Sequence, residues 1–332
     1  MRDCAMNLSP AEVATFGDRG FLVKPGVFSA DDMRPICGAI ARRIDEAARE
    51  LHAAGQLKEL FAAEPFETRL ARIMAAEPEA GKSIYTTMLG KGGGGYHGPE
   101  MFAMLTHPGL MGCIESLVGP EIVGASVYRI RAKLPDFAHG EVPWHQDSGY
   151  LLTHCDRHLI VTCWIPLVDA TLANGCLYVL PDAHRNGVFR HYTGGHGGFL
   201  EIPAETLPPG AIPVEMKAGG VLFMTNLTPH ASFKNSTDMI RWSIDLRYQS
   251  ADAPNNVGEA PESYTPERDP VTMACYPPEA DFVIRSPSHP EREVRTAAQF
   301  EALRESYEKA LPYFPGRGWS PLAARGELKI AD

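Results

Sequence analysis

The pattern of residues along the chain changes near residue 121, and this change limits the folds that the chain can adopt. From there to about residue 250, short runs of β-branched and aromatic residues alternate with turns rich in glycine, proline and asparagine. Short strands in close succession, with few helices between them, are typical of a double-sheet jelly roll. We therefore expect a mainly β protein with flanking helices and a jelly-roll, cupin-like core. The runs lie at 122–134, 142–147, 158–168, 176–180, 211–216, 221–225, 230–234 and 240–249.

The part of the chain before residue 121 has helical patterns instead. Ser9 and Ser29 are predicted helix N-caps, and Pro10 suits the first helical position. After Ser29, apolar residues recur every three or four positions until Gly55, which predicts one long amphipathic helix that ends there. Further helices are expected near 67–76 and 107–118, and a short strand at Phe21-Leu22-Val23.

The segment after residue 250 is rich in proline and charge. It is predicted to wrap around the barrel, with one helix near 296–311. We therefore divide the chain into a helical part (1–120) that packs on the barrel, a catalytic core (121–250) and a C-terminal wrap (251–332). All three are expected to belong to one structural domain.

Composition excludes several classes of function. The formal net charge of −10 at pH 7 lacks the basic footprint of a nucleic-acid-binding protein. The longest apolar runs are strand-sized, far short of the roughly 20 residues that span a bilayer, so no membrane association is expected. The N-terminus does not resemble a secretory signal, and the seven cysteines include no C-x-x-C motif. We expect a cytoplasmic monomer or homodimer that acts on a small-molecule substrate.

The pattern H-x-D/E points to a metal site. Non-haem Fe(II) oxygenases bind iron through two imidazoles and one carboxylate, which leaves other coordination positions open. Residues i and i+2 of a strand share a face, so one strand can supply two ligands and a distant histidine the third. The pattern alone is weak, because it occurs at His139/Glu141, His145/Asp147, His154/Asp156 and His289/Glu291.

A downstream spacing distinguishes one of these pairs, His145 and Asp147. They end an apolar run, and His230 further on is followed by Ser232 two residues later and by Arg241 eleven residues later. A hairpin from His230 to Arg241 would hold the guanidinium at about the length of 2-oxoglutarate from the metal. A guanidinium can bind the far carboxylate of that cosubstrate bidentately, and Ser232 can add a hydroxyl bond. The three predicted metal ligands, also the predicted catalytic residues, are His145, Asp147 and His230.

Three segments together resemble the phytanoyl-CoA dioxygenase family: Trp144-His145-Gln146-Asp147, Asn174–His184, and His230 through Arg241. The resemblance covers roughly residues 15–250. It implies a double-stranded β-helix that uses Fe(II), 2-oxoglutarate and dioxygen. By the same resemblance, the 2-oxoglutarate pocket is lined by Gln146, Trp164, Ser232 and Arg241.

One departure from the family is visible. The chain has Pro181-Asp182-Ala183-His184 where the family often has Pro-Gly-Ser-His. This suggests a divergent subfamily, whose substrate does not follow from the family name.

Arg129, Arg131 and Lys133 share one face of a predicted strand, which is either a solvated edge or turned towards the cosubstrate. Lys133 resembles a lysine that the family conserves, and in the family the residues two and four positions before it face the cosubstrate. Arg129 and Arg131 are therefore further candidates for cosubstrate binding. Arg247 either pairs with Asp245 or contacts substrate. Tyr150 and His97 complete the candidate substrate residues.

The residues and the resemblance together predict an Fe(II)- and 2-oxoglutarate-dependent dioxygenase. It is expected to hydroxylate an unactivated C–H bond of a small polar or anionic molecule, with release of succinate and CO2. One alternative is the same chemistry on an acyl-CoA or secondary metabolite, as hydroxylation, desaturation or cyclisation. Another is a non-catalytic metal-binding jelly-roll protein, which would have no need for Arg241. Asp147 argues against a halogenase, since chloride needs the place of the carboxylate.

Overall fold

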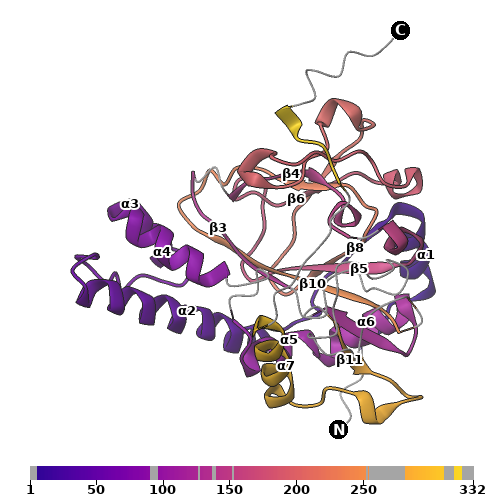
Figure 1. Cartoon of the computed structure of the whole chain (residues 1–332), viewed down its shortest axis with the longest axis horizontal. Helices are drawn as coiled ribbons and strands as arrows, with labels where there is room; N and C mark the ends of the chain where they lie inside the picture. Colours follow the sequence, from indigo (N-terminus) through magenta and orange to yellow (C-terminus); the bar gives the residue numbers. More distant parts are fainter. Residues whose placement is uncertain are drawn as a thin grey trace.

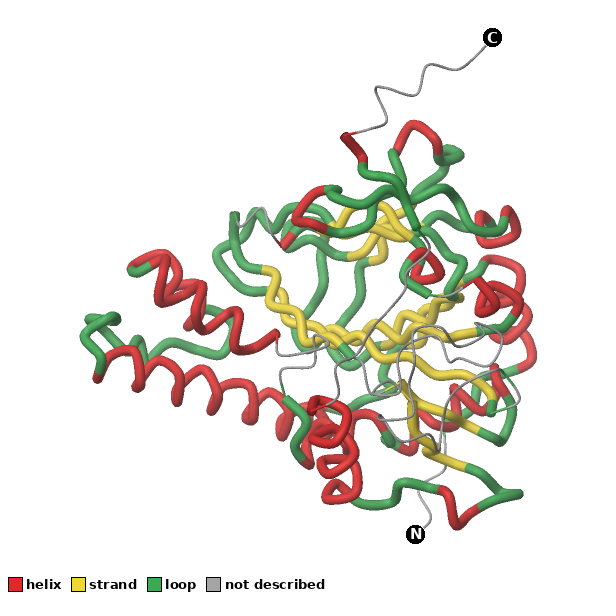
Figure 2. Tube along the Cα trace, viewed as in Figure 1, coloured by secondary structure: helices red, strands yellow, loops and turns green. Residues whose placement is uncertain are grey.

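The computed structural model describes residues 6–89, 96–125, 128–136, 140–151, 153–251, 253, 281–309 and 318–323. Two β-sheets form the centre of the molecule, with helices along one side (Figures 1 and 2). The named strands pair antiparallel with one another throughout the described part. The mainly β fold with flanking helices is therefore confirmed.

The major sheet has the strand order β1-β8-β5-β10-β2-β11, and β3 pairs with β10 beside this path. The minor sheet has the order β4-β9-β6-β7. The major strands are β1 (Phe21–Lys24), β2 (Ile122–Ala125), β3 (Arg129–Lys133), β5 (Ile160–Pro166), β8 (Val221–Thr225), β10 (Arg241–Ser250) and β11 (Asp281–Arg285). The minor strands are β4 (Val142–His145), β6 (Leu177–Val179), β7 (Ile212–Val214) and β9 (His230–Ser232). Each run predicted in 122–249 overlaps one of these strands or, at 122–134, two.

The helices begin largely where the sequence predicts. Ser9 and Ser29 both form capping boxes, which start α1 (Pro10–Arg19) and α2 (Ala30–Ala53). α2 ends two residues before Gly55, which has the positive φ of 71° typical of a residue that follows a helix. The helices predicted near 67–76 and 107–118 are α3 (Arg69–Ala76) and α6 (Pro108–Val118), whereas α4 (Pro78–Leu89) and α5 (Pro99–Leu105) were not predicted.

Strand β10 separates an apolar layer from a polar one. Trp242, Ile244 and Leu246 belong to the main hydrophobic core with residues of α2, α5 and α6. The alternate residues, which include Arg241, Asp245 and Arg247, line a cavity between the two sheets. The alternation along one strand thus places apolar side chains towards the helices and charged ones towards the interior of the barrel.

Pro99–Val118 is long and apolar enough to span a membrane by length and composition, a criterion that core helices of soluble proteins also meet. In this fold the segment is two helices, α5 and α6, and the residues between them are not helical. Leu105, Leu110 and Ile114 of this segment are buried in the main hydrophobic core.

The described residues after 280 return to the barrel. β11 pairs with β2, and the predicted C-terminal helix is α7 (Ala297–Lys309), which packs against α5 (Figure 1). Residues 318–323 reach the opposite end of the molecule, where the Trp319 indole N–H donates to the Gly149 carbonyl at 2.8 Å. β11 was not predicted, because it is a single short apolar run within a charged region.

Candidate metal centre

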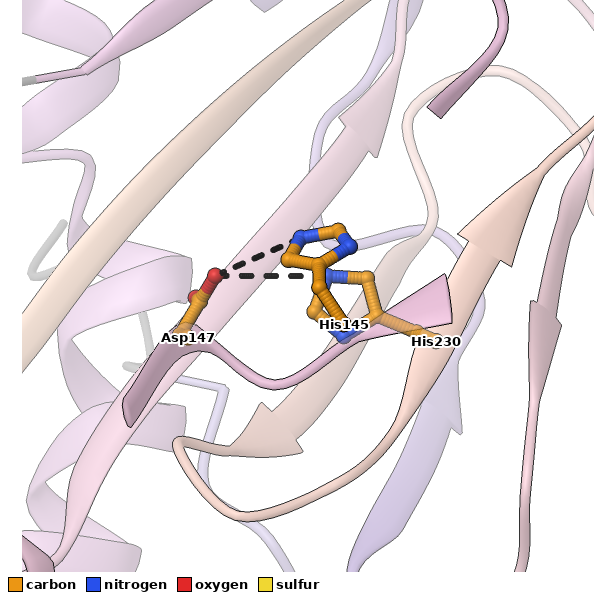
Figure 3. A group of neighbouring side chains, drawn as sticks. All are labelled: His145, Asp147 and His230. Atoms are coloured by element: carbon orange, nitrogen blue, oxygen red, sulfur yellow. Dashed lines mark ion pairs between the residues drawn. The ribbon is translucent and has the colours of Figure 1, made fainter. Parts of the chain in front are cut away.

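The side chains of His145, Asp147 and His230 converge (Figure 3). They border the cavity between the two sheets. Oδ1 of Asp147 lies 3.8 Å from Nε2 of His145 and 4.0 Å from Nε2 of His230. The three potential ligand atoms are within 4.8 Å of one another, and all three residues are buried. Among the described residues, this is the one group of histidine, cysteine or acidic side chains that could hold a metal ion.

Pairing in the minor sheet brings the two histidines together. His145 is the last residue of β4, and its cross-strand partner on β9 is His230. Asp147 does not share the strand, because β4 ends at His145 and Asp147 begins the 3-10 turn Asp147–Gly149. The expectation that strand alternation presents both residues of the H-x-D pair was therefore wrong. The turn carries the carboxylate towards the imidazoles instead (Figure 3).

Backbone carbonyls fix the orientation of both imidazoles. Nδ1 of His145 lies 2.9 Å from the Pro143 carbonyl oxygen, and Nδ1 of His230 lies 3.0 Å from that of Thr228. When Nδ1–H donates to these carbonyls, the lone pair of each neutral ring is on Nε2, which faces Asp147. Burial, together with the neighbouring His230, holds the pKa of His145 well below its ordinary value. Neutral imidazoles are the form that binds metal.

Asp147 is held as an anion by two neighbours from the major sheet. Arg247 donates from Nε to Oδ2 at 2.9 Å and from Nη2 to Oδ1 at 3.1 Å, and the Thr162 hydroxyl donates to Oδ2. Burial alone would raise the pKa of Asp147, but the charge and hydrogen bonds of Arg247, together with the two neighbouring histidines, outweigh it and the net shift is downward. Two neutral nitrogens and one carboxylate oxygen form a donor set that suits Fe(II).

The cavity beside the triad lies between the two sheets and has two compartments. The larger has a volume of about 350 Å³ and the smaller one of about 250 Å³. Both are bordered by Val142, His145 and Phe199, so they adjoin at the triad. The charged side chains that line them, within the described residues, are Arg129, Arg131, Lys133, Arg241 and Arg247, with Asp147 and Asp245.

Arg241 lies in the larger compartment with 1% of its surface exposed. Its guanidinium donates to the hydroxyls of Ser243 and Ser232 and lies 5.1 Å from the centre of the Trp164 ring. Neither Nε of Arg241 nor the indole N–H of Trp164 has a hydrogen-bond partner, although both are buried. Burial lowers the pKa of Arg241 to about 10. A buried guanidinium with an unused donor is costly, and an anion in the compartment would offset that cost.

Arg129 and Arg131 both border the two compartments, which excludes a fully solvated edge for this face of β3. Arg131 donates from Nε to Asp245 at 2.6 Å, and this carboxylate raises the pKa of Arg131 against the opposing effect of burial. Arg129 donates to the Tyr128 carbonyl at 3.3 Å. Lys133 lies deeper and donates to three carbonyls, those of Gly140, Ser232 and Phe233.

The other candidate residues have different positions. Tyr150 borders the smaller compartment, and its ring meets that of His145 edge-on at 5.8 Å. Gln146 is buried, but its amide bonds to the backbone of Gly187, Phe189 and Leu227, and it borders neither compartment. His97 also borders neither compartment. Arg247 binds Asp147, a partner that neither sequence-based alternative had named.

Thr162, Tyr85 and Phe199 are among the residues at the site that were not predicted. Thr162 lies two positions before Trp164 on β5, so strand alternation could have revealed it. Tyr85 reaches the larger compartment from α4, and Phe199 reaches both from the long segment between β6 and β7. No local pattern marks these two, because they reach the cavity only through tertiary packing.

The remaining H-x-D/E pairs differ from the triad or are not described. His289 and Glu291 form an ion pair at 3.4 Å with side chains 60% and 70% exposed. His139 and the side chain of His154 lie outside the described residues.

Two histidines and one carboxylate in this arrangement form the ligand set of a mononuclear non-haem Fe(II) oxygenase, and a jelly roll suits that class. Comparison with known proteins gives the family. The family model of phytanoyl-CoA dioxygenase matches residues 16–243, and the chain belongs to this family. With the triad, this makes the chain an Fe(II)- and 2-oxoglutarate-dependent dioxygenase.

Relatives agree with this assignment. Phytanoyl-CoA dioxygenase domain-containing protein 1 of Mus musculus is 26% identical over 272 residues, which cover 74% of this chain and 91% of the relative. A phytanoyl-CoA dioxygenase of Arabidopsis thaliana is 33% identical over 115 residues, which cover 34% of this chain and 40% of that protein. The solved structure of ThoJ, a non-heme monooxygenase, has a TM-score of 0.53 at 18% identity and covers 90% of this chain and 96% of its own. The likeness to ThoJ concerns the fold.

Proposed function

We propose that the chain hydroxylates an unactivated C–H bond of a small polar or anionic molecule, with release of succinate and CO2. The observation that carries this proposal is the charge of the cavity. Four arginines, Lys133 and two aspartates border its compartments in the described part. Burial lowers the pKa of Lys133 to about 6, so the arginines carry the positive charge. Both acids are bound by arginines, Asp147 by Arg247 and Asp245 by Arg131. Such an excess of buried positive charge favours anionic ligands.

His145, Asp147 and His230 are the proposed ligands of Fe(II). When bound, the iron supplies the activation of dioxygen, coupled to oxidative decarboxylation of 2-oxoglutarate, that oxidises a substrate C–H bond. The carbonyls of Pro143 and Thr228 orient the imidazoles so that Nε2 of each ring faces Asp147, and Arg247 holds the carboxylate ionised.

Arg241 is the proposed anchor of the far carboxylate of 2-oxoglutarate. Its guanidinium and the free indole N–H of Trp164 offer donors within one compartment, whereas the Ser232 hydroxyl accepts from Arg241 and donates to the Gly175 carbonyl. Full burial makes each charge-assisted bond stronger than it would be in water. The free donors on Arg241 and Trp164 also favour a cosubstrate-dependent enzyme over a non-catalytic barrel.

The smaller compartment is the proposed substrate site. It is bordered by His145 and Asp147 and also by Arg129, Arg131 and Tyr150. A carboxylate or phosphate group of the substrate would bind the two arginines and keep the rest of the molecule next to the metal ligands. Phe199 and Val142 supply apolar surface that reduces access of water.

A long acyl-CoA thioester is the rival suggested by the names of the relatives. Such a substrate needs an extended apolar channel next to the metal. In this chain most side chains of the smaller compartment are polar or charged. The lining therefore favours a small polar substrate over a branched fatty acyl chain.

A turnover screen tests the proposal. The purified protein with Fe(II), 2-oxoglutarate and dioxygen is incubated with small carboxylates, phosphates, neutral polar compounds and acyl-CoA thioesters, and succinate and oxidised product are quantified. The proposal predicts that small anionic compounds release succinate and product in equal amounts. It is contradicted if only acyl-CoA thioesters or neutral hydrophobic compounds do so.

A further inference from the structure

The carboxylate of Asp147 accepts hydrogen bonds from two residues, and these two residues are cross-strand partners of each other. Thr162 on β5 lies opposite Arg247 on β10, and both side chains are buried. The register of the major sheet therefore places a hydroxyl and a guanidinium side by side beneath the carboxylate. The other two candidate ligands have no such arrangement, because their Nδ1 atoms bond to backbone carbonyls.

The hydrogen bonds leave Asp147 little freedom in how it can bind a metal. An ionised carboxylate has about four lone-pair positions, two on each oxygen. Oδ2 accepts from the Thr162 hydroxyl and from Nε of Arg247, so both of its positions are used. Oδ1 accepts one bond, from Nη2 of Arg247, and is the oxygen that lies 3.8 Å and 4.0 Å from the two Nε2 atoms. One position remains, on the oxygen that faces the histidines.

We propose that Arg247 and Thr162 are positioning residues that restrict Asp147 to binding the metal through Oδ1 alone. A carboxylate free to bind through both oxygens would occupy a second coordination position. Binding through one oxygen leaves that coordination position open for the cosubstrate and dioxygen. This inference rests on the proposed metal centre and assigns a role in it to two residues outside the predicted ligand set.

The charge of Arg247 could have a different purpose, and the two possibilities predict different results for a variant that keeps this charge. If Arg247 only neutralises Asp147, metal affinity is unchanged as long as the positive charge is kept. If Arg247 positions the carboxylate, losing its paired donors weakens metal binding even when the charge is kept. Thr162 carries no charge, so its hydroxyl tests positioning alone.

Three variants separate these possibilities. Arg247→Lys keeps the charge but loses the planar pair of donors. Thr162→Val removes the hydroxyl at constant shape, and Thr162→Ser restores it as the matched control. The dissociation constant of Fe(II) alone is measured anaerobically by calorimetry, and the visible spectrum of bound Co(II) reports the coordination.

Residues that orient metal ligands typically contribute about 10- to 100-fold to metal affinity. We therefore expect Thr162→Val and Arg247→Lys to bind Fe(II) about 10- to 100-fold more weakly, with an altered Co(II) spectrum. Thr162→Ser should keep both the affinity and the spectrum of the unmodified chain.

Wild-type affinity and spectrum in Thr162→Val and in a folded Arg247→Lys would overturn the positioning role. If Arg247→Lys does not fold, as judged by circular dichroism, Thr162→Val against Thr162→Ser decides alone. A failure of the unmodified chain to bind one equivalent of metal would contradict the proposed metal centre itself, so the two failures can be told apart.

Discussion

Replacing Arg241 with methionine should separate cosubstrate binding from metal binding. Arg241 is 1% exposed, and its guanidinium lies between Trp164 and two serine hydroxyls in the larger compartment. Methionine keeps much of the aliphatic volume and removes the donors. Losing one partner of a buried, charge-assisted pair costs about 2–5 kcal/mol, which corresponds to roughly 30-fold to several-thousand-fold in affinity.

The assay is a titration of 2-oxoglutarate into the anaerobic Fe(II) protein, followed by the visible absorption of the chelate. We expect the dissociation constant of 2-oxoglutarate to rise at least about 30-fold, while that of Fe(II) stays near its original value. Arg185→Met is the matched control, because this arginine is 57% exposed, pairs with Asp18 and borders neither compartment. It should leave both constants unchanged.

Stability gives a second readout of the same substitution. Burial lowers the pKa of Arg241, so its charged form makes the folded state less stable when no anion is bound. Arg241→Met should therefore leave the Tm of the ligand-free protein unchanged or raise it, and it should abolish the increase in Tm that 2-oxoglutarate causes. If Arg241→Met binds 2-oxoglutarate with an affinity within about threefold of that of the unmodified chain, this reasoning is refuted. Arg129 or Arg131 would then be the candidate anchor of the cosubstrate.

Three further predictions concern the substrate site, a surface ion pair and the C-terminal residues. Arg129→Met and Arg131→Met should each raise the KM of an anionic substrate about tenfold or more while leaving that of 2-oxoglutarate less affected; equal effects on both would argue against a separate substrate site. Glu12 has its pKa lowered to about 2, mainly by the hydrogen bond from Lys24, so it stabilises the fold above its ordinary pKa and loses this effect as the pH falls towards 2. Glu12→Gln should thus lower the Tm at pH 7 but not near pH 2, as thermal unfolding at both pH values can check. Trp319→Phe removes the bond to Gly149 and should cost about 1 kcal/mol of unfolding free energy in urea, and no change would show that residues 318–323 contribute little there.

The sequence predicted those parts of the fold that depend on local pattern. Short runs predicted the strands of the two sheets except β11, and serine caps predicted the starts of α1 and α2. The hairpin expected from His230 to Arg241 was wrong, because β9 and β10 belong to different sheets and do not pair with each other. Both residues nevertheless border one cavity, since the two sheets face each other there.

Features that depend on contacts between distant segments were not predictable. Asp147 reaches the histidines from a turn, and its partner Arg247 is 100 residues away along the chain. The charge pattern of β10 suggested Asp245 as the partner of Arg247, but Asp245 binds Arg131 on the neighbouring strand. Which carboxylate an arginine meets is decided by sheet register and by the 3-10 turn, and neither is visible in one strand.

Pocket residues supplied by other elements were likewise not predictable. Tyr85 comes from α4, a helix that the sequence pattern did not reveal, and it borders the larger compartment. The opposite error was made for Gln146, which was predicted to line the 2-oxoglutarate pocket but borders neither compartment. Gln146 lies between two of the metal ligands in the sequence. The chain direction at the end of β4 turns its side chain to the backbone around Gly187 and Leu227.

The most direct test of the central claim is the anaerobic visible spectrum of the protein with one equivalent of Fe(II) and 2-oxoglutarate. The account predicts the weak charge-transfer band of a cosubstrate that chelates iron through its carboxylate and ketone. The band should be absent in His145→Ala and in His230→Ala, and it should persist in His289→Ala, which changes a histidine of an exposed H-x-E pair. A band that survives loss of His145 or His230, or that never forms in the unmodified chain, would contradict the account.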